Sequence, residues 1–142
     1  LQAKVVKVSD GDTIVVSPID GGEYFKCRLY GIDTPEGKQA YGDVATTALK
    51  HLILAKTVEI TTTGDLTHNR EVCRITLDGM DVNLEMVKQG HAWAYRKFLK
   101  KQFKASYIEA ETQAKSKRIG LWKDDNPIPP WEYRAAERNH ER

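Results

Sequence analysis

The sequence predicts an α+β fold, because five strand-like runs are interrupted and followed by three segments with helical spacing. The strand-like runs are short and either β-branched or alternating, whereas each helical segment carries an apolar stripe. A chain of 142 residues fits one domain and can bury a core without disulfides or structural metals. We therefore expect a single domain over residues 1–142, with an extended proline-rich tail from about Asp124.

The first three strands are expected to form a meander in the N-terminal third of the chain. The strand-like runs cover Val5–Val8, Thr13–Val16 and Tyr24–Leu29. Between the second and third runs, Asp20–Gly22 reads Asp-Gly-Gly, which supplies the positive φ angles of a tight hairpin. The first turn, Ser9–Asp12, brings two carboxylates to the end of a strand.

The middle of the chain adds one helix and two strands. A helix is expected over 42–55, where apolar residues recur at helical spacing. Strand signals return in Thr57–Thr63 and in Val72–Leu77, and Asp78-Gly79 makes the next turn. The total of five strands is the number in a small Greek-key OB barrel, so we expect a five-stranded OB-fold β-barrel with three α-helices.

Two further helices are expected before the tail. One covers Val82–Gln89, is capped by Asp81 or Asn83, and stops at Gly90. The other, longer helix runs from about Phe103 to Arg118. Both predictions rest on helical spacing of apolar residues between stop signals.

The tail is expected to be extended. Three prolines within Asn126–Trp131 remove backbone donors and fix φ, which excludes regular structure there. We expect Trp131 and Tyr133 to pack on the domain in this conformation, and the charged end after Arg138 to fray.

Overall composition restricts the class of protein. Hydrophobic residues make up 40% of the chain and charged residues 30%, which disfavours disorder. No apolar run is long enough to cross a bilayer, so we expect a soluble protein without a membrane partner. The net charge of +2, from 22 basic and 20 acidic residues, is too balanced to indicate a polyanionic partner by itself.

Four carboxylates lie in two loops next to predicted strands. Asp10 and Asp12 belong to the first turn, and Asp33 and Glu36 follow the third strand. If the loops converge, mutual repulsion raises the pKa values of these carboxyls unless a cation lies among them. Oxygen ligands of this kind suit Ca²⁺ or Mg²⁺ and not zinc. Ordinary turn chemistry explains either loop alone, but not the two together with an arginine beside them.

Two arginines are placed to bind a phosphate near these loops. Arg28 lies between the apolar residues Cys27 and Leu29, so it faces away from the core if they face inward. Arg70, at the entrance to the fifth strand, could supply a second clamp. Arginine donates two parallel hydrogen bonds to a phosphate and keeps its charge, which suits a dianionic transition state. Taken singly, each arginine fits a surface ion pair better.

Together these motifs resemble those of the staphylococcal (micrococcal, thermonuclease-type) nuclease family. The resemblance covers roughly Val5 to Asn126, and the first two motifs are specific in combination. The motifs occur in the family's order and rough spacing: Asp10-Gly11-Asp12-Thr13, Arg28-Leu29-Tyr30-Gly31-Ile32-Asp33-Thr34-Pro35-Glu36, Asn69-Arg70 and Gly120-Leu121-Trp122.

The resemblance implies an OB barrel with three helices and Ca²⁺-dependent hydrolysis of DNA and RNA with little base specificity, leaving 3′-phosphates. By matching positions, Asp12 and Asp33 bind calcium through their side chains, and Thr34 binds it through its backbone carbonyl. Glu36 holds the attacking water and acts as general base. A free glutamate has a pKa of about 4.3 and is a weak base at neutral pH, so this role depends on positioning.

The resemblance assigns roles to further residues. Arg28 and Arg70 bind the scissile phosphate, and Asp10 is a carboxylate behind the metal ligands. Tyr95 resembles the family's nucleotide-binding tyrosine. His68 stands where the best-known member has a tyrosine that meets the nucleotide phosphate, so it is either a phosphate donor or an ordinary loop histidine.

Aromatic and basic residues occur together around Tyr95, a mixture that suits stacking on unpaired bases beside a groove for the nucleic-acid backbone. This favours single-stranded DNA and RNA as partners, although core packing explains some of the aromatics equally well. A solvated helix face also explains the basic clusters. The aromatics are Trp93, Tyr95 and Phe98, and the basic clusters are Arg96, Lys97, Lys100, Lys101 and Lys104, and Lys115, Lys117, Arg118 and Lys123.

The two cysteines, Cys27 and Cys73, are too few for a disulfide framework and lack the CxxC spacing of zinc sites. We expect both to point into the barrel as buried thiols or, in an oxidising compartment, as a cross-strand disulfide. The chain begins at Leu1 without an initiator Met, which a trimmed export signal or a truncation would explain. With the resemblance, this favours a secreted or periplasmic monomer.

Two rival functions belong to other classes. A non-catalytic OB module could bind nucleic acid, but it would not need the acidic and basic residues that this chain keeps. A small calcium-binding protein is the third possibility, and paired arginines beside its carboxylates would be unfavourable.

Overall fold

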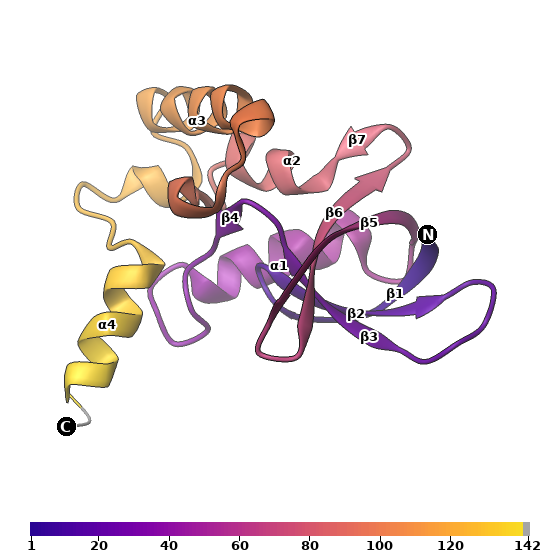
Figure 1. Cartoon of the computed structure of the whole chain (residues 1–142). Coiled ribbons are helices and arrows are strands. Elements are labelled where there is room, and N and C mark those ends of the chain that lie inside the picture. Colours follow the sequence, from indigo (N-terminus) through magenta and orange to yellow (C-terminus); the bar gives the residue numbers. More distant parts are fainter. Residues whose placement is uncertain (141–142) are drawn as a thin grey trace.

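The computed structural model describes residues 1–140 and has an α+β architecture (Figure 1). Two 3₁₀ turns, Arg96–Phe98 and Gly120–Lys123, precede and follow the longest helix. The strands and helices, in chain order, are β1 (Gln2–Asp10), β2 (Thr13–Pro18), β3 (Phe25–Leu29), β4 (Ile32–Asp33), α1 (Gly42–Ile53), β5 (Thr57–Thr67), β6 (Arg70–Leu77), β7 (Met80–Asp81), α2 (Val82–Lys88), β8 (Trp93–Ala94), α3 (Lys101–Ser116) and α4 (Pro130–His140).

The main sheet has the order β3-β2-β1-β5-β6-β7, and its neighbouring strands are antiparallel. β3 pairs in addition with β6, in parallel, so the two ends of the run β3-β2-β1-β5-β6 are joined. A second, small sheet pairs β4 with β8. These pairings bring the β1–β2 turn, the end of β3 and the start of β6 into one neighbourhood.

The core lies between the sheet and helices α1 and α2. Along β3, Cys27 and Leu29 are buried while Arg28 points to the other face, as the alternation of a strand requires. α1 packs on β1, and α2 packs on both β6 and α3. Figure 1 shows α3 at the top of the molecule and α4 set apart at the lower left. Within residues 1–140, no helix combines the length and the apolarity needed to span a membrane.

A buried asparagine joins α2 to the sheet. Asn83 is fully buried; its Oδ1 accepts from the Ile75 backbone N–H at 3.0 Å. Its Nδ2 donates to the carbonyls of Tyr30, at 2.9 Å, and Cys73, at 3.0 Å. The helix cap is Asp81, whose side chain accepts from the Leu84 backbone N–H. Of the two residues expected as caps, Asp81 has that role and Asn83 ties β6 to the loop before β4.

The α+β class, the five main strands and the three expected helices are confirmed in place. The extended tail and the total of three helices are wrong, because Pro130–His140 forms a fourth helix, α4. Of the tail residues that the structure describes, 124–129 lack helix and strand. A proline is compatible with the first turn of a helix, where its missing N–H has no partner to lose. Pro130 therefore begins α4, and the prolines before it form the connection.

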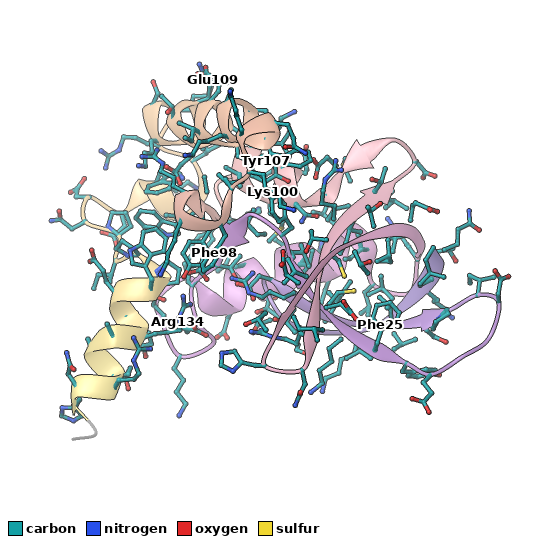
Figure 2. All side chains as sticks on the ribbon, viewed as in Figure 1. Phe25, Phe98, Lys100, Tyr107, Glu109 and Arg134 are labelled. Atoms are coloured by element: carbon teal, nitrogen blue, oxygen red, sulfur yellow. The ribbon has the colours of Figure 1, made fainter. Side chains whose placement is uncertain are left out.

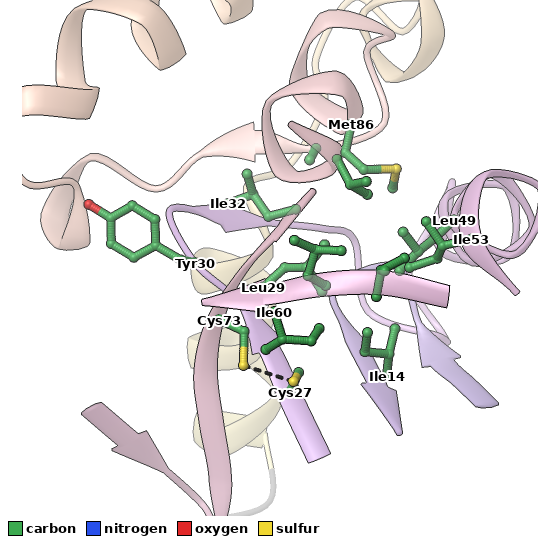
Figure 3. Close-up of a cluster of buried hydrophobic side chains, with 14 of the residues drawn as sticks. Ile14, Cys27, Leu29, Tyr30, Ile32, Leu49, Ile53, Ile60, Cys73 and Met86 are labelled. Atoms are coloured by element: carbon green, nitrogen blue, oxygen red, sulfur yellow. Dashed lines mark hydrogen bonds between the residues drawn. The ribbon is translucent and has the colours of Figure 1, made fainter. Parts of the chain in front are cut away.

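Both cysteines are buried, as expected, and are free thiols in this structure. Their Sγ atoms lie 2.8 Å apart, across the parallel pairing of β3 and β6 (Figure 3). The hydrogen bond with Cys73, together with burial, raises the pKa of the Cys27 thiol. A cross-strand disulfide in an oxidising compartment stays a prediction.

Candidate active site

An arginine joins the two aspartates that the sequence assigns to a metal. Asp12 lies in the turn between β1 and β2, and Asp33 ends β4. From β3, Arg28 contacts both: its Nη1 lies 3.3 Å from Asp12 Oδ2, and its Nη2 lies 3.3 Å from Asp33 Oδ1. Both carboxylates are therefore within reach of one guanidinium, which confirms that the two loops converge.

Asp12 is held rigidly by its neighbours. Its Oδ2 accepts from the Thr34 backbone N–H at 3.1 Å and from the Thr34 hydroxyl at 3.0 Å. The Thr13 hydroxyl donates to Oδ1 at 3.2 Å. Burial acts to raise the pKa of Asp12, but the charge of Arg28 and the hydrogen bonds outweigh it, and the pKa lies below its ordinary value. Asp12 is thus a fixed, ionised carboxylate.

Asp10 stands behind Asp12 at the end of β1. Its Oδ1 accepts from the Asp12 backbone N–H at 3.0 Å, which shapes the β1–β2 turn. Burial and the charge of Asp12 raise the pKa of Asp10 to about 7. Asp10 therefore supports the turn that presents Asp12, consistent with a place behind the metal ligands.

Arg70 reaches the site through a hydroxyl. It begins β6, and its Nη1 donates to Thr13 Oγ1 at 3.1 Å, while its Nε donates to the Thr67 carbonyl at 3.2 Å. Thr13 pairs with Arg28 across β2 and β3. The side chains of Arg70, Thr13 and Asp12 consequently form one hydrogen-bonded chain beside Arg28.

Glu36 is presented by a compact turn before α1. The Glu36 backbone N–H donates to Gln39 Oε1 at 3.1 Å, and the Gln39 backbone N–H donates to the Glu36 carbonyl at 2.9 Å. A Cβ atom built on Gly42 would lie 1.9 Å from the Glu36 carbonyl oxygen. Glycine at the first position of α1 therefore allows the main chain of Glu36 to lie against the helix.

Arg134 of α4, which the sequence analysis did not single out, completes the cluster of ionised side chains. It donates two hydrogen bonds to Asp33, from Nη1 to Oδ1 at 3.1 Å and from Nη2 to Oδ2 at 2.8 Å. Its Nη1 also donates to Glu36 Oε1 at 2.8 Å, and its Nη2 lies 3.4 Å from the Tyr95 hydroxyl. Figure 2 shows Arg134 on the side of α4 that faces the domain. Burial raises the pKa of Asp33, and the hydrogen bonds and charges of Arg134 and Arg28 oppose that rise.

The two residues expected to bind substrate lie in different surroundings. Tyr95 follows β8; Phe98 meets its ring edge-on at 4.8 Å, and Trp131 stacks on it at 5.4 Å between ring centres. A cavity of about 390 Å³ lies beside it, between Arg28 and Phe98. His68 is exposed in the β5–β6 turn, two residues before Arg70, and makes no hydrogen bond among the described residues.

The donor atoms suit a hard cation. Asp12, Asp33 and Glu36 offer oxygen only, and a guanidinium cation already lies against two of them. Within residues 1–140, no group of three or more His, Cys, Asp or Glu side chains is arranged as a finished metal site. The carboxylates are instead neutralised by arginines, and their oxygen atoms are of the kind that suits a hard cation such as calcium.

Comparison with known proteins places this arrangement in a family. The model of the staphylococcal nuclease homologue family matches residues 26–124, which is more than half of the chain. The chain belongs to the staphylococcal nuclease family. The matched stretch contains Arg28, Asp33, Glu36 and Arg70, whereas Asp12 and helix α4 lie outside it.

Three curated relatives cover most of this chain. An "Uncharacterized endonuclease" of Haemophilus influenzae is 38% identical over 135 residues, which are 95% of this chain and 74% of the relative. An "Uncharacterized endonuclease" of Escherichia coli is 36% identical over 137 residues, covering 94% of this chain and 85% of the relative. A "Micrococcal nuclease" of Shigella flexneri is 33% identical over 147 residues, covering 97% and 83%. Family membership and the names of these relatives together identify the chain, at the level of its family, as a nuclease.

Proposed function

We propose that the protein is a Ca²⁺-dependent nuclease that hydrolyses phosphodiester bonds of DNA and RNA with little base specificity, on a five-stranded OB barrel. The observation that carries the proposal is the convergence of carboxylates from two loops: Arg28 bridges Asp12 and Asp33. Arg134 in turn joins Asp33 to Glu36. Family membership supports the reaction class. Cleavage to 3′-phosphates, a monomeric state and a secreted or periplasmic location stay predictions.

The chain's own residues divide the chemistry among them. Asp12 and Asp33, with the Thr34 carbonyl, would hold calcium, which when bound polarises a phosphoryl oxygen and lowers the pKa of water. Glu36 would accept a proton from the attacking water, and its compact turn supports this because a positioned base needs a fixed main chain. The remaining contribution is charge neutralisation at the phosphate.

The two arginines are suited to that neutralisation. Arg28 and Arg70 lie on strands that are paired in parallel, β3 and β6, so their guanidinium groups approach the site from one sheet. Negative charge that grows on the phosphoryl oxygens in the transition state is stabilised by cations already in place. His68 could add a donor to the phosphate from the turn next to Arg70.

The cavity beside Arg28 supports an unpaired nucleotide as substrate. Tyr95, Phe98 and Leu66 line it together with Arg28, and both Phe98 and Leu66 are exposed. Aromatic and apolar walls accept any base face, whereas readout of sequence would need donors aimed at base edges. A single-stranded substrate with one phosphate at Arg28 and its base against these walls fits the cavity.

A cleavage assay separates the proposal from its rival, a non-catalytic OB-fold module that binds nucleic acid. The full chain is incubated with end-labelled single-stranded DNA, with Ca²⁺ or with a chelator. We expect cleavage in the samples that contain Ca²⁺ and none in the samples that contain the chelator. Cleavage in the presence of the chelator would contradict calcium dependence. Binding without cleavage supports the rival. An Arg28→Ala protein prepared in the same way controls for contaminating nuclease and is expected to lose cleavage while keeping its circular dichroism spectrum.

A further inference from the structure

Helix α4 places a cation on the carboxylates that the proposed reaction needs. The guanidinium nitrogens of Arg134 donate hydrogen bonds of 2.8 to 3.1 Å to both oxygens of Asp33 and to one oxygen of Glu36. Asp33 has no exposed surface, so its oxygens are reached only by groups inserted into the site. A guanidinium bonded to both oxygens of Asp33 fills the position from which a second cation would contact the same two oxygens.

The contacts of Arg134 extend to the predicted substrate side of the site. Its Nη2 approaches the Tyr95 hydroxyl, and Trp131, one turn earlier in α4, stacks on the Tyr95 ring with an angle of 8° between the planes. α4 thus covers one face of the tyrosine and the carboxylates at once. These two contacts come from different side chains of one helix, so a movement of α4 changes both.

The contacts of α4 with the domain come mainly from partly exposed side chains. Pro130 is its buried residue, and the other described side chains of α4 are partly or fully exposed. The connection 124–129 has no helix or strand, and one of its carbonyls, that of Ile128, accepts from Gln39. Release of α4 would break the packing of Trp131 on Trp93 and Tyr95 and the ion pairs of Arg134. The main core cluster contains no side chain of α4, so this local opening does not require the domain to unfold.

We propose that Arg134 and calcium are alternative occupants of the position between Asp33 and Glu36, so that metal binding releases α4. The proposal rests on the calcium dependence proposed above. A docked α4 is an internal competitor: if it is docked ten times as often as it is free, the apparent affinity for calcium falls about tenfold. The same linkage requires calcium to weaken the docking of α4, and to do so more strongly as the calcium concentration rises above the dissociation constant.

The test measures calcium affinity and the opening of α4 separately. Full-length protein freed of metal is titrated with CaCl₂ by calorimetry, as wild type, Arg134→Ala and Arg138→Ala. Arg138 is the matched control because it lies one turn further along α4, has the same charge, and is exposed. Arg134→Ala is expected to bind calcium about tenfold more tightly than wild type, and Arg138→Ala within about twofold of wild type.

Hydrogen exchange gives the second measurement. Calcium is expected to speed exchange of the backbone amide hydrogens of 131–140 in the wild type, and to leave them nearly unchanged in Arg134→Ala, where they already exchange fast. Equal calcium affinity of wild type and Arg134→Ala, or slower exchange of α4 with calcium, overturns the inference and leaves the proposed function standing. If no variant binds calcium, the inference and the calcium dependence both fail.

Discussion

Glu36 combines a fixed main chain with a side chain that has one ionic partner. Its backbone is bonded in both directions to Gln39, and its carboxylate, about a third exposed, contacts Arg134. Replacing the carboxylate of Glu36 by a group of the same shape is therefore expected to leave the turn unchanged. Any loss of activity on an isosteric substitution reports on the carboxylate itself.

We expect Glu36→Gln to lower kcat about 100-fold or more while KM for single-stranded DNA changes little, because an amide cannot accept a proton from water. Steady-state kinetics with a fluorogenic oligonucleotide measures both constants. Glu132→Gln, an exposed glutamate on α4, is the control and is expected to retain the wild-type kcat. Unchanged turnover in Glu36→Gln would remove the role of general base.

A second residue-scale prediction concerns Gly42. Alanine is normally favoured over glycine in a helix, by about 0.5–1 kcal/mol. Here the added Cβ would lie 1.9 Å from the Glu36 carbonyl oxygen, so the turn that carries Glu36 has to move. We expect Gly42→Ala to lower kcat at least about tenfold. Gly37→Ala is the matched control, since a Cβ there meets nothing within 4 Å; equal kinetics of the two variants would contradict the argument.

The histidine next to α2 gives a prediction about pH. The Tyr41 hydroxyl lies 2.9 Å from His91 Nδ1, and burial lowers the pKa of His91. The unfolded chain, with a histidine pKa of about 6.5, therefore binds the proton more readily, and stability from neutral His91 is present above that pH and lost below it. We expect the free energy of unfolding of wild type relative to His91→Gln to fall between pH 7 and pH 5. Urea titrations measure it, and a constant difference contradicts the assignment.

Sequence reasoning reached the site residues that lie in turns and failed for Arg134. Asp12 and Asp33 stand in short motifs whose turn chemistry fixes where they point. Arg134 is 101 residues away from Asp33, in a charged stretch that resembles any solvated helix face. The signal that could have found it is the aromatic pair Trp131 and Tyr133 just before it, which already indicated packing of this segment on the domain.

At the scale of elements, the strands and helices with clear periodicity were predictable, and those defined by distant partners were not. β4 and β8 have two residues each and exist because they pair with one another across the chain. α4 was hidden by its prolines, which normally argue against a helix. Proline disrupts the interior of a helix, but Pro130 stands at the first position of α4, where proline is tolerated.

Attachment of α2 to the sheet depends on Asn83, which makes three buried hydrogen bonds to backbone groups of Tyr30, Cys73 and Ile75. We expect Asn83→Ala to lower the free energy of unfolding by about 3 kcal/mol, because it leaves buried backbone groups without partners. Urea unfolding followed by circular dichroism measures the change. A loss below about 1 kcal/mol would mean that water or a shifted side chain replaces the amide.

A left-handed backbone conformation is needed at Gly31, between β3 and β4. Its φ of 77° lies in the left-handed region, and a Cβ there would meet Leu99 at 2.8 Å. The turn at Gly31 therefore redirects the chain from Arg28, on the sheet, to Asp33, in the site. In this way one glycine couples the strand to the loop that carries Asp33.

At the scale of the whole molecule, the site lies where the sheet and the C-terminal helix meet. Arg28 and Arg70 come from the joined strands, and Asp12 comes from the turn between β1 and β2. Asp33 comes from the small sheet and Arg134 from α4. Elements from both ends of the chain therefore converge on one cluster of charges. Binding of a cation to this cluster is expected to affect the stability of the complete fold.

We expect calcium at about 100 times its dissociation constant to raise the free energy of unfolding by about 2.7 kcal/mol, because the metal binds the folded chain alone. Thermal unfolding with and without calcium measures the change. Asp33→Asn removes a buried carboxylate from the site and is expected to abolish the increase. The same increase in both proteins would place calcium elsewhere.

The aromatic contacts of α4 have a consequence for spectroscopy. The three tryptophans of the sequence form one cluster, with Trp93 lying 4.5 Å from Trp122 and 5.4 Å from Trp131 between ring centres. Intrinsic emission therefore reports on one corner of the molecule and not on the sheet. Unfolding curves from emission and from far-ultraviolet circular dichroism will coincide only if that corner melts together with everything else.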